Sequence, residues 1–189
     1  MTAFPTLIII DMQNCMASPE AGQRNNPQAE SNIASLLAAW RAAGAPVVHV
    51  RHISRNPRSG FAPGQPGAAF QPEFAPFPHE HVVEKNVPDA FVHSGLERWL
   101  RTRGIEKLVI AGVSTNISVE DSARSAGNLG FATTVVSDAT FTFARRDHEG
   151  RQRSPDEVHA MSLSNLDGEY ATITDTRTLL AGLERQHAA

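Results

Sequence analysis

Disulfides, membrane spans and strongly charged segments are all missing from this sequence of 189 residues. Its one cysteine, Cys15, cannot form a disulfide within the chain, which favours a reducing compartment such as the cytoplasm. No apolar run is long enough to cross a bilayer. The N-terminal run ends at Asp11 and has no basic segment before it, so we expect a strand there and not a signal peptide. The net charge of −3 and the absence of a basic stripe argue against nucleic acid and membranes as partners.

Several motifs of common active sites are missing as well. The sequence has neither GxGxxG nor a phosphate-binding loop, and neither GxSxG nor SxxK surrounds Ser118. No pair of histidines has HxxxH or HExxH spacing, and there is no cysteine cluster, so we expect no metal and no cofactor. Surface positions or core hydrogen bonds are the expected roles of His49, His52, His79, His81 and His93, although His52, at a strand end, could contact a substrate.

Short apolar runs alternate with helical patterns along the chain. We expect six strands, at 7–11, 46–52, 81–85, 107–113, 132–139 and 170–174. The expected helices are 31–44, 91–103, 115–129, 154–166 and 176–186, and the fourth opens with a capping box at Ser154 and Glu157. Strands this apolar, separated by helices, predict a mainly parallel six-stranded sheet covered on both faces. The prediction is therefore one three-layer, doubly wound, Rossmann-like α/β domain over residues 1–189.

A segment rich in Pro, Gly and Phe interrupts this alternation at about residues 54–80. A plain linker is one interpretation. Structureless segments of this length are uncommon inside a domain unless they shape a site or an interface. We expect a loop that covers the substrate or contacts another subunit, packed through Phe61, Phe70, Phe74 and Phe77.

Polar residues stand where the predicted strands end. Sheets of this kind bind ligands beyond the carboxyl ends of their strands, where the strand order reverses. Asp11, His52, Lys85 and the loop after Gly112 all occupy such ends. A buried carboxylate needs a partner, and a lysine beside Asp11 would keep it ionised and orient it as a base. A structural ion pair between Asp11 and Lys85 remains an equally open interpretation.

Ser118 lies in the first turn of the helix that begins near Thr115. Backbone N–H groups converge there, which suits an oxyanion hole and would lower the pKa of a cysteine. On local sequence alone, a small serine that caps the helix is the stronger interpretation.

Three segments together resemble the signature segments of the isochorismatase-like hydrolase superfamily: LIIIDMQN with Asp11, VVEKNVPDAF with Lys85, and IAGVSTNISVEDSARSAGNLGF with Ser118. The runs PVVHVRH, FVHSGLERWL, VVSDATFTF and EVHAMSLSNLDGEYATI resemble further blocks, so the match covers nearly the whole chain. Most members are cysteine hydrolases of amides, ureides or N-carbamoyl groups. The resemblance implies Asp11 as base, Lys85 as its cationic partner and position 118 as nucleophile. It also implies a cis peptide between Val113 and Ser114, with an oxyanion hole there shared with the Ser118 N–H.

Position 118 departs from the family pattern, because it is Ser where the amidases have Cys. A thiol is partly ionised near neutral pH, whereas an alcohol needs a base throughout its attack. The serine could be an engineered replacement or mark a natural branch without the thiol. We expect hydrolysis at an amide or ureide C–N bond. One alternative is vinyl-ether hydrolysis by Asp11 without covalent catalysis, as in true isochorismatases, although His52 stands where those enzymes have Gln; another is a catalytically silent ligand-binding protein.

The remaining expectations concern the surroundings of this site. His52, Phe61 and Asn116 are expected to contact a small-molecule substrate, and Cys15 is expected to serve packing. The metal-binding Asp/His set of nicotinamidases is not apparent in RHISRNPRSG. By resemblance, the protein is expected to form a homodimer or homotetramer in the cytoplasm.

Overall fold

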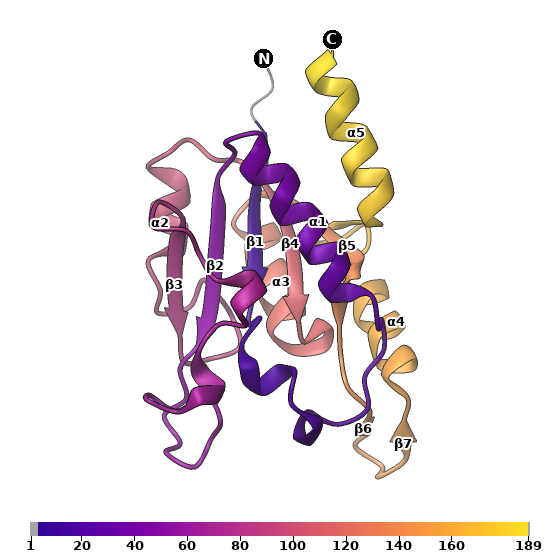
Figure 1. The fold of residues 1–189 in the computed structure, drawn as a ribbon. Coiled ribbons are helices and arrows are strands. Elements are labelled where there is room, and N and C mark those ends of the chain that lie inside the picture. Colours follow the sequence, from indigo (N-terminus) through magenta and orange to yellow (C-terminus); the bar gives the residue numbers. More distant parts are fainter. Residues whose placement is uncertain (1–3, 189) are drawn as a thin grey trace.

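Six parallel strands form the central sheet of the computed structural model, which describes residues 4–188 (Figure 1). Residues 1–3 and 189, which the single-domain prediction includes, lie outside the described part of the chain. The strands in spatial order are β3 (His81–Lys85), β2 (Val47–His52), β1 (Thr6–Ile10), β4 (Lys107–Val113), β5 (Ala132–Phe141) and β8 (Thr172–Thr174). The predicted doubly wound α/β fold is confirmed, and the sheet is entirely parallel.

The strand order reverses between β1 and β4. From β1 the chain proceeds outward to β2 and β3, then returns to β4 and proceeds the other way to β5 and β8. All five residues of β1 are buried, as expected for a central strand covered on both faces. The crevice that this topology uses for ligands therefore lies at the carboxyl ends of β1 and β4.

Helices cover both faces of the sheet, and each face has its own apolar core. The front face in Figure 1 carries α1 (Ala29–Ala42) and α5 (Thr176–Ala188), and the back carries α2 (Leu96–Arg101), α3 (Glu120–Asn128) and α4 (Pro155–Leu166). Trp40 of α1 is fully buried in the first core and Leu100 of α2 in the second. None of the helices within residues 4–188 has the length and apolar character needed to cross a membrane.

The predicted starts of two helices, α4 and α2, can be compared with the structure. At α4, Ser154 Oγ accepts from the Glu157 amide at 3.2 Å and Glu157 Oε2 accepts from the Ser154 amide at 2.7 Å, so the predicted capping box is present. The prediction of a helix over 91–103 is wrong in length, because α2 covers only residues 96–101. Asp89 Oδ1 accepts from the Phe91 amide at 2.7 Å, and His93 has a φ of +53°, so turns occupy the segment before α2.

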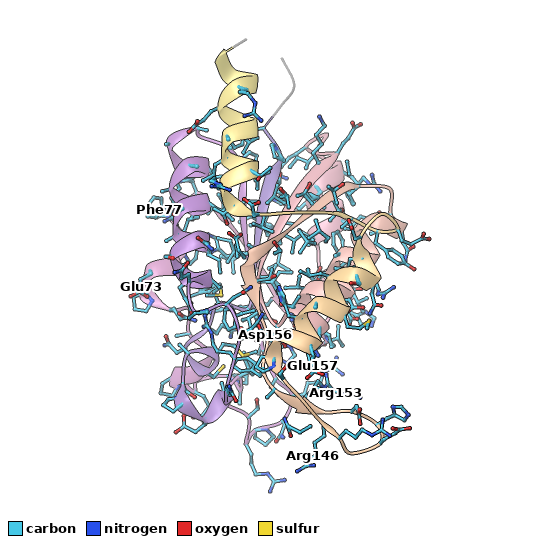
Figure 2. All side chains as sticks on the ribbon, turned by 90° about the vertical axis from the view of Figure 1, so that its right-hand side faces the viewer. Glu73, Phe77, Arg146, Arg153, Asp156 and Glu157 are labelled. Atoms are coloured by element: carbon cyan, nitrogen blue, oxygen red, sulfur yellow. The ribbon has the colours of Figure 1, made fainter. Side chains whose placement is uncertain are left out.

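The Pro-, Gly- and Phe-rich segment packs against α1 and the sheet. It contains two short 3₁₀ turns, η3 (Pro66–Ala68) and η4 (Pro72–Phe74), and Phe74 is buried in the core. The guanidinium of Arg41 on α1 stacks on Phe77, 3.7 Å from the ring centre, and Figure 2 shows Phe77 beside α1. Two further 3₁₀ turns, η1 (Asn14–Met16) and η2 (Pro19–Ala21), follow β1.

A small antiparallel hairpin after β5 was not predicted. Its strands, β6 (Arg145–Arg146) and β7 (Gln152–Arg153), have two residues each and no apolar alternation to reveal them. Arg153 pairs with Asp147 at 2.8 Å in the turn and with Glu157 on α4 at 3.5 Å. Figure 2 shows Arg146 and Arg153 on this hairpin, beyond the end of the sheet and close to α4.

Candidate active site

Three side chains meet at the carboxyl end of the sheet. Lys85 Nζ donates to Asp11 Oδ2 at 2.7 Å and to Ser118 Oγ at 3.2 Å. The relative exposures are 1% for Asp11, 2% for Lys85 and 7% for Ser118. The structure thus brings together the three residues that the sequence suggested, and one ammonium group connects the carboxylate to the hydroxyl.

Asp11 leaves β1 in an unusual backbone conformation. Its φ is +53°, its amide donates to the Val50 carbonyl at 2.9 Å, and its carbonyl accepts from the Gln13 amide at 2.7 Å. Its second carboxylate oxygen, Oδ1, is buried and has no hydrogen-bond partner within the described residues. Burial raises the pKa of Asp11 above its ordinary value, while Lys85 and the Ser118 hydroxyl partly oppose that shift. Oδ1 is therefore the atom of this carboxyl group that is free to accept or give a proton.

Lys85 reaches Asp11 because of the strand order. It is the last residue of β3 and lies in register with His52 on β2, which separates β3 from β1. An ammonium group buried this deeply requires acceptors, and Asp11 and Ser118 provide them.

Ser118 is placed by the tight turn that follows β4. Gly112 has a φ of +123°, and a Cβ there would lie 2.1 Å from the Ile10 carbonyl oxygen, so only glycine permits this approach of β4 to β1. The next peptide, Val113–Ser114, is cis, as the resemblance implied. A single π-helical turn, η5 (Thr115–Val119), then leads into α3.

One carbonyl at the start of this turn accepts from the amides on either side of the nucleophile position. The Ser114 carbonyl accepts from the Ile117 amide at 3.2 Å and from the Val119 amide at 3.1 Å. The Ser118 amide lies between these two bonded amides in η5. The Ser118 carbonyl accepts from Ser122 Oγ at 2.6 Å, which fixes the peptide on its other side. The resemblance implies that the Ser118 N–H, beside Oγ, takes part in an oxyanion hole.

His52 and Phe61, two of the expected substrate contacts, lie against each other next to Lys85. Their rings meet edge to face with centroids 5.3 Å apart, and both residues are half-buried. Burial and the nearby Lys85 lower the pKa of His52, while Asp11 and the Val87 backbone act in the opposite direction. His52 is therefore neutral at pH 7.

Asn116, the third expected contact, is directed toward β5. Its Oδ1 accepts from the Thr142 hydroxyl, and it lines a cavity of about 930 Å³ between α4 and the β6–β7 hairpin. The structure does not bring its side chain together with Asp11 and Lys85.

Cys15 lies in η1 and is half-buried. A Cβ on Gly67 would lie 2.9 Å from the Cys15 Cβ, and one on Gly60 would lie 3.2 Å from it, so the residue packs closely against the inserted segment. Burial, with a further contribution from Asp11, raises the pKa of its thiol to about 11. Such a thiol stays protonated and is a poor nucleophile.

Gln13 is the important polar residue that the sequence did not reveal. It is fully buried; its Nε2 donates to the carbonyls of His52 at 3.0 Å and Ala68 at 2.8 Å, and its Oε1 accepts from the His52 amide at 2.8 Å. The only available signal was its position two residues after Asp11, in a segment that leaves a buried strand.

The described residues offer no metal site, since no group of three or more His, Cys, Asp or Glu side chains among them is arranged to hold an ion.

Comparisons with known proteins agree with this geometry. The family model described as the isochorismatase domain matches residues 5–178, a range that contains Asp11, Lys85 and Ser118. The isochorismatase family protein YrdC of Bacillus subtilis is 36% identical over 181 residues, covering 96% of this chain and 97% of that protein. The ureidoacrylate amidohydrolase RutB of Methylobacterium radiotolerans is 26% identical over 212 residues, covering 94% of this chain and 78% of that protein. A crystal structure of an isochorismatase family protein from Chromobacterium violaceum superposes with a TM-score of 0.93 at 52% identity, covering 96% of this chain and 94% of that one.

Proposed function

Because the chain belongs to the isochorismatase family of hydrolases, we propose that it hydrolyses a C–N bond in a small amide or ureide, using Asp11, Lys85 and Ser118. The observation that carries the proposal is the Lys85 ammonium group, which donates to Asp11 at 2.7 Å and to Ser118 at 3.2 Å in a buried site. The amidohydrolase activity in the name of one relative supports the bond type.

The geometry suits attack by the serine hydroxyl. Ser118 Oγ bonds to the carbonyl carbon of the substrate, and its proton passes to the unpaired Oδ1 of Asp11. The Ser118 amide, which the family resemblance assigns to the oxyanion hole, stabilises the negative charge on the carbonyl oxygen. When the C–N bond breaks, Asp11 gives the proton to the leaving nitrogen, which leaves an acyl group on Ser118 and an ionised Asp11. Water then releases the acyl group as an acid.

The test is a panel of amides, ureides and N-carbamoyl compounds assayed with four proteins. Wild type should turn over at least one of them, and Asp11→Asn and Ser118→Ala should each lose at least about 100-fold in kcat, in the range expected for a missing general base or nucleophile. Ser164→Ala, which changes an exposed serine on α4, is the matched control and should retain wild-type kcat. Turnover that survives Asp11→Asn would contradict the proposal, and no turnover by any form would favour a ligand-binding protein.

One observation favours a second candidate, the hydrolysis of a vinyl ether. Burial raises the pKa of Asp11, and its Oδ1 is unpaired, so a protonated Asp11 could donate a proton to the carbon of an enol ether. This reaction needs no nucleophilic side chain. Hydrolysis of a vinyl ether such as isochorismate, lost in Asp11→Ala and unchanged in Ser118→Ala, would support this route over the acyl-serine route.

A further inference from the structure

We infer that His52 is the base that activates the water in the second half of the reaction, an inference that rests on the proposed acyl-serine route. The alkoxide of Ser118 is a much poorer leaving group than the thiolate of a cysteine enzyme, so it needs a proton in order to leave the tetrahedral intermediate. A site that uses Ser118 therefore needs more proton transfer than one that uses a thiol.

His52 has the position for this role. It is the last residue of β2 and lies in register with Lys85, so the two side chains project from the same face of the sheet. The Phe61 ring meets the imidazole edge to face, with centroids 5.3 Å apart, and limits its rotation. The register places the ring beside Lys85, and the charges of Lys85 and Asp11 act in opposite directions on the pKa of His52.

The backbone that carries this ring is held firmly. The Gln13 side chain accepts from the His52 amide at 2.8 Å and donates to its carbonyl at 3.0 Å, as a neighbouring strand would. A third bond, from Gln13 to the Ala68 carbonyl at 2.8 Å, joins the inserted segment to the same point. Gln13 is therefore a positioning residue for His52.

The protonation state of the ring fits a base. Burial and Lys85 on β3 lower the pKa of His52, while Asp11 at the end of β1 and the Val87 backbone raise it; Phe61 of the inserted segment is uncharged. A neutral imidazole carries one N–H and one nitrogen with a lone pair. The nitrogen with the lone pair is the one that accepts a proton.

The step balances with the groups present. The free nitrogen of His52 takes a proton from water as the water oxygen bonds to the acyl carbon. The bond from that carbon to Ser118 Oγ breaks, and Oγ receives a proton from Lys85, its hydrogen-bond donor at 3.2 Å. The imidazolium of His52 then returns a proton to Lys85, which leaves Ser118 as the free alcohol and the product as the acid.

The role of His52 as the base for deacylation can be tested with p-nitrophenyl acetate, an activated ester that acylates Ser118 in place of the natural substrate. Wild type should release p-nitrophenolate in a burst followed by a steady rate that reports the hydrolysis of acetyl-Ser118, and Ser118→Ala should show neither. In His52→Gln we expect the burst to remain and the steady rate to fall by about 100-fold, the lower range of general-base effects. His81→Gln is the matched control, because His81 is also a half-buried histidine at the sheet but stacks on Trp99, 4.5 Å away and outside the site.

Two further measurements separate a chemical role from a structural one. The steady rate of wild type should fall with decreasing pH as His52 becomes protonated, and this inflection should be missing in His52→Gln and present in His81→Gln. Added imidazole should restore deacylation in His52→Ala. A Ser118-dependent burst whose steady rate is unchanged in His52→Gln would overturn the His52 inference alone. Release that is identical in wild type and Ser118→Ala would overturn the acyl-serine proposal together with it.

Discussion

Removal of the Lys85 ammonium group should destabilise the fold strongly. At the observed separation of 2.7 Å from Asp11 Oδ2, the attraction is about 6 kcal/mol for an effective dielectric constant of about 20. The desolvation of both groups offsets part of this attraction, but removing one member leaves the other charge buried without a partner. For Lys85→Met we therefore expect a loss of about 3–5 kcal/mol in the free energy of unfolding at pH 8.

The loss should depend on pH, because Asp11 can neutralise itself only by taking up a proton. Burial already raises the pKa of Asp11 in the folded protein, and losing Lys85 removes the main opposing influence. A carboxyl group whose pKa is higher in the folded than in the unfolded protein binds more protons when folded. Its contribution to the free energy of unfolding therefore becomes more favourable to the fold as the pH falls through the folded pKa. The cost of Lys85→Met should therefore be smaller at pH 5 than at pH 8, by at least about 1 kcal/mol.

Urea unfolding followed by circular dichroism measures this loss, with equal m-values as the condition for comparing midpoints. Asp11→Asn/Lys85→Met is the internal control, because it contains neither buried charge and should recover most of the stability at pH 8. The reasoning is refuted if Lys85→Met costs less than about 1 kcal/mol at pH 8, if the cost is the same at both pH values, or if the double variant is no more stable than the single one.

Three further predictions concern stability measured by urea midpoints. Gln13→Ala removes three hydrogen bonds from a buried amide and should lower the free energy of unfolding by about 2–4 kcal/mol. A loss below about 1 kcal/mol would contradict the role of Gln13 in holding the His52 backbone. Burial alone would raise the pKa of Glu80, but bonds from Arg41 and the Phe77 amide, together with His49, lower it to about 2. Ionised Glu80 therefore stabilises the fold above its ordinary pKa of 4.5, and this stabilisation is lost as the pH falls toward 2. In Glu80→Gln the free energy of unfolding should fall less steeply between these pH values. The same pH dependence as in wild type would refute this role of Glu80. Ser154→Ala removes the N-cap of α4 and should cost about 1 kcal/mol, whereas an unchanged midpoint would show that the cap contributes nothing.

The sheet could be predicted from the sequence because its strands are nearly continuous apolar runs. Residues 81–85 and 107–113 form strands with the predicted bounds. The start of α2 could not be predicted, because the turns at 89–95 depend on a hydrogen bond that Asp89 accepts from the Phe91 amide and on a positive φ at His93, neither of which an apolar period reveals. The β6–β7 hairpin has too few residues in each strand to produce a period.

The candidate site was predictable only in part. The topology places the carboxyl ends of β1, β2 and β3 together, so Asp11, His52 and Lys85 had to be neighbours once the fold was known. The side-chain directions within turns were not predictable. Asn116 is two residues from Ser118, yet it bonds to Thr142, which follows β5, because successive residues of a helical turn point in different directions. The catalytic roles of Asp11, Lys85 and Ser118 remain predictions until activity is measured.

The oxygen at position 118 also affects the charge balance of the buried site. With Ser118 neutral, one ammonium and one carboxylate balance, so Asp11 can stay ionised and serve as the base. A thiolate in the same place would add a second anion near Lys85, and a single cation cannot offset both in a site this buried, so one proton would be shared between position 118 and Asp11. In Ser118→Cys we therefore expect pH–rate inflections that belong to the pair and shift when Asp11 is changed to Asn. Inflections in Ser118→Cys that Asp11→Asn leaves in place would show instead that the thiol titrates independently of the carboxylate.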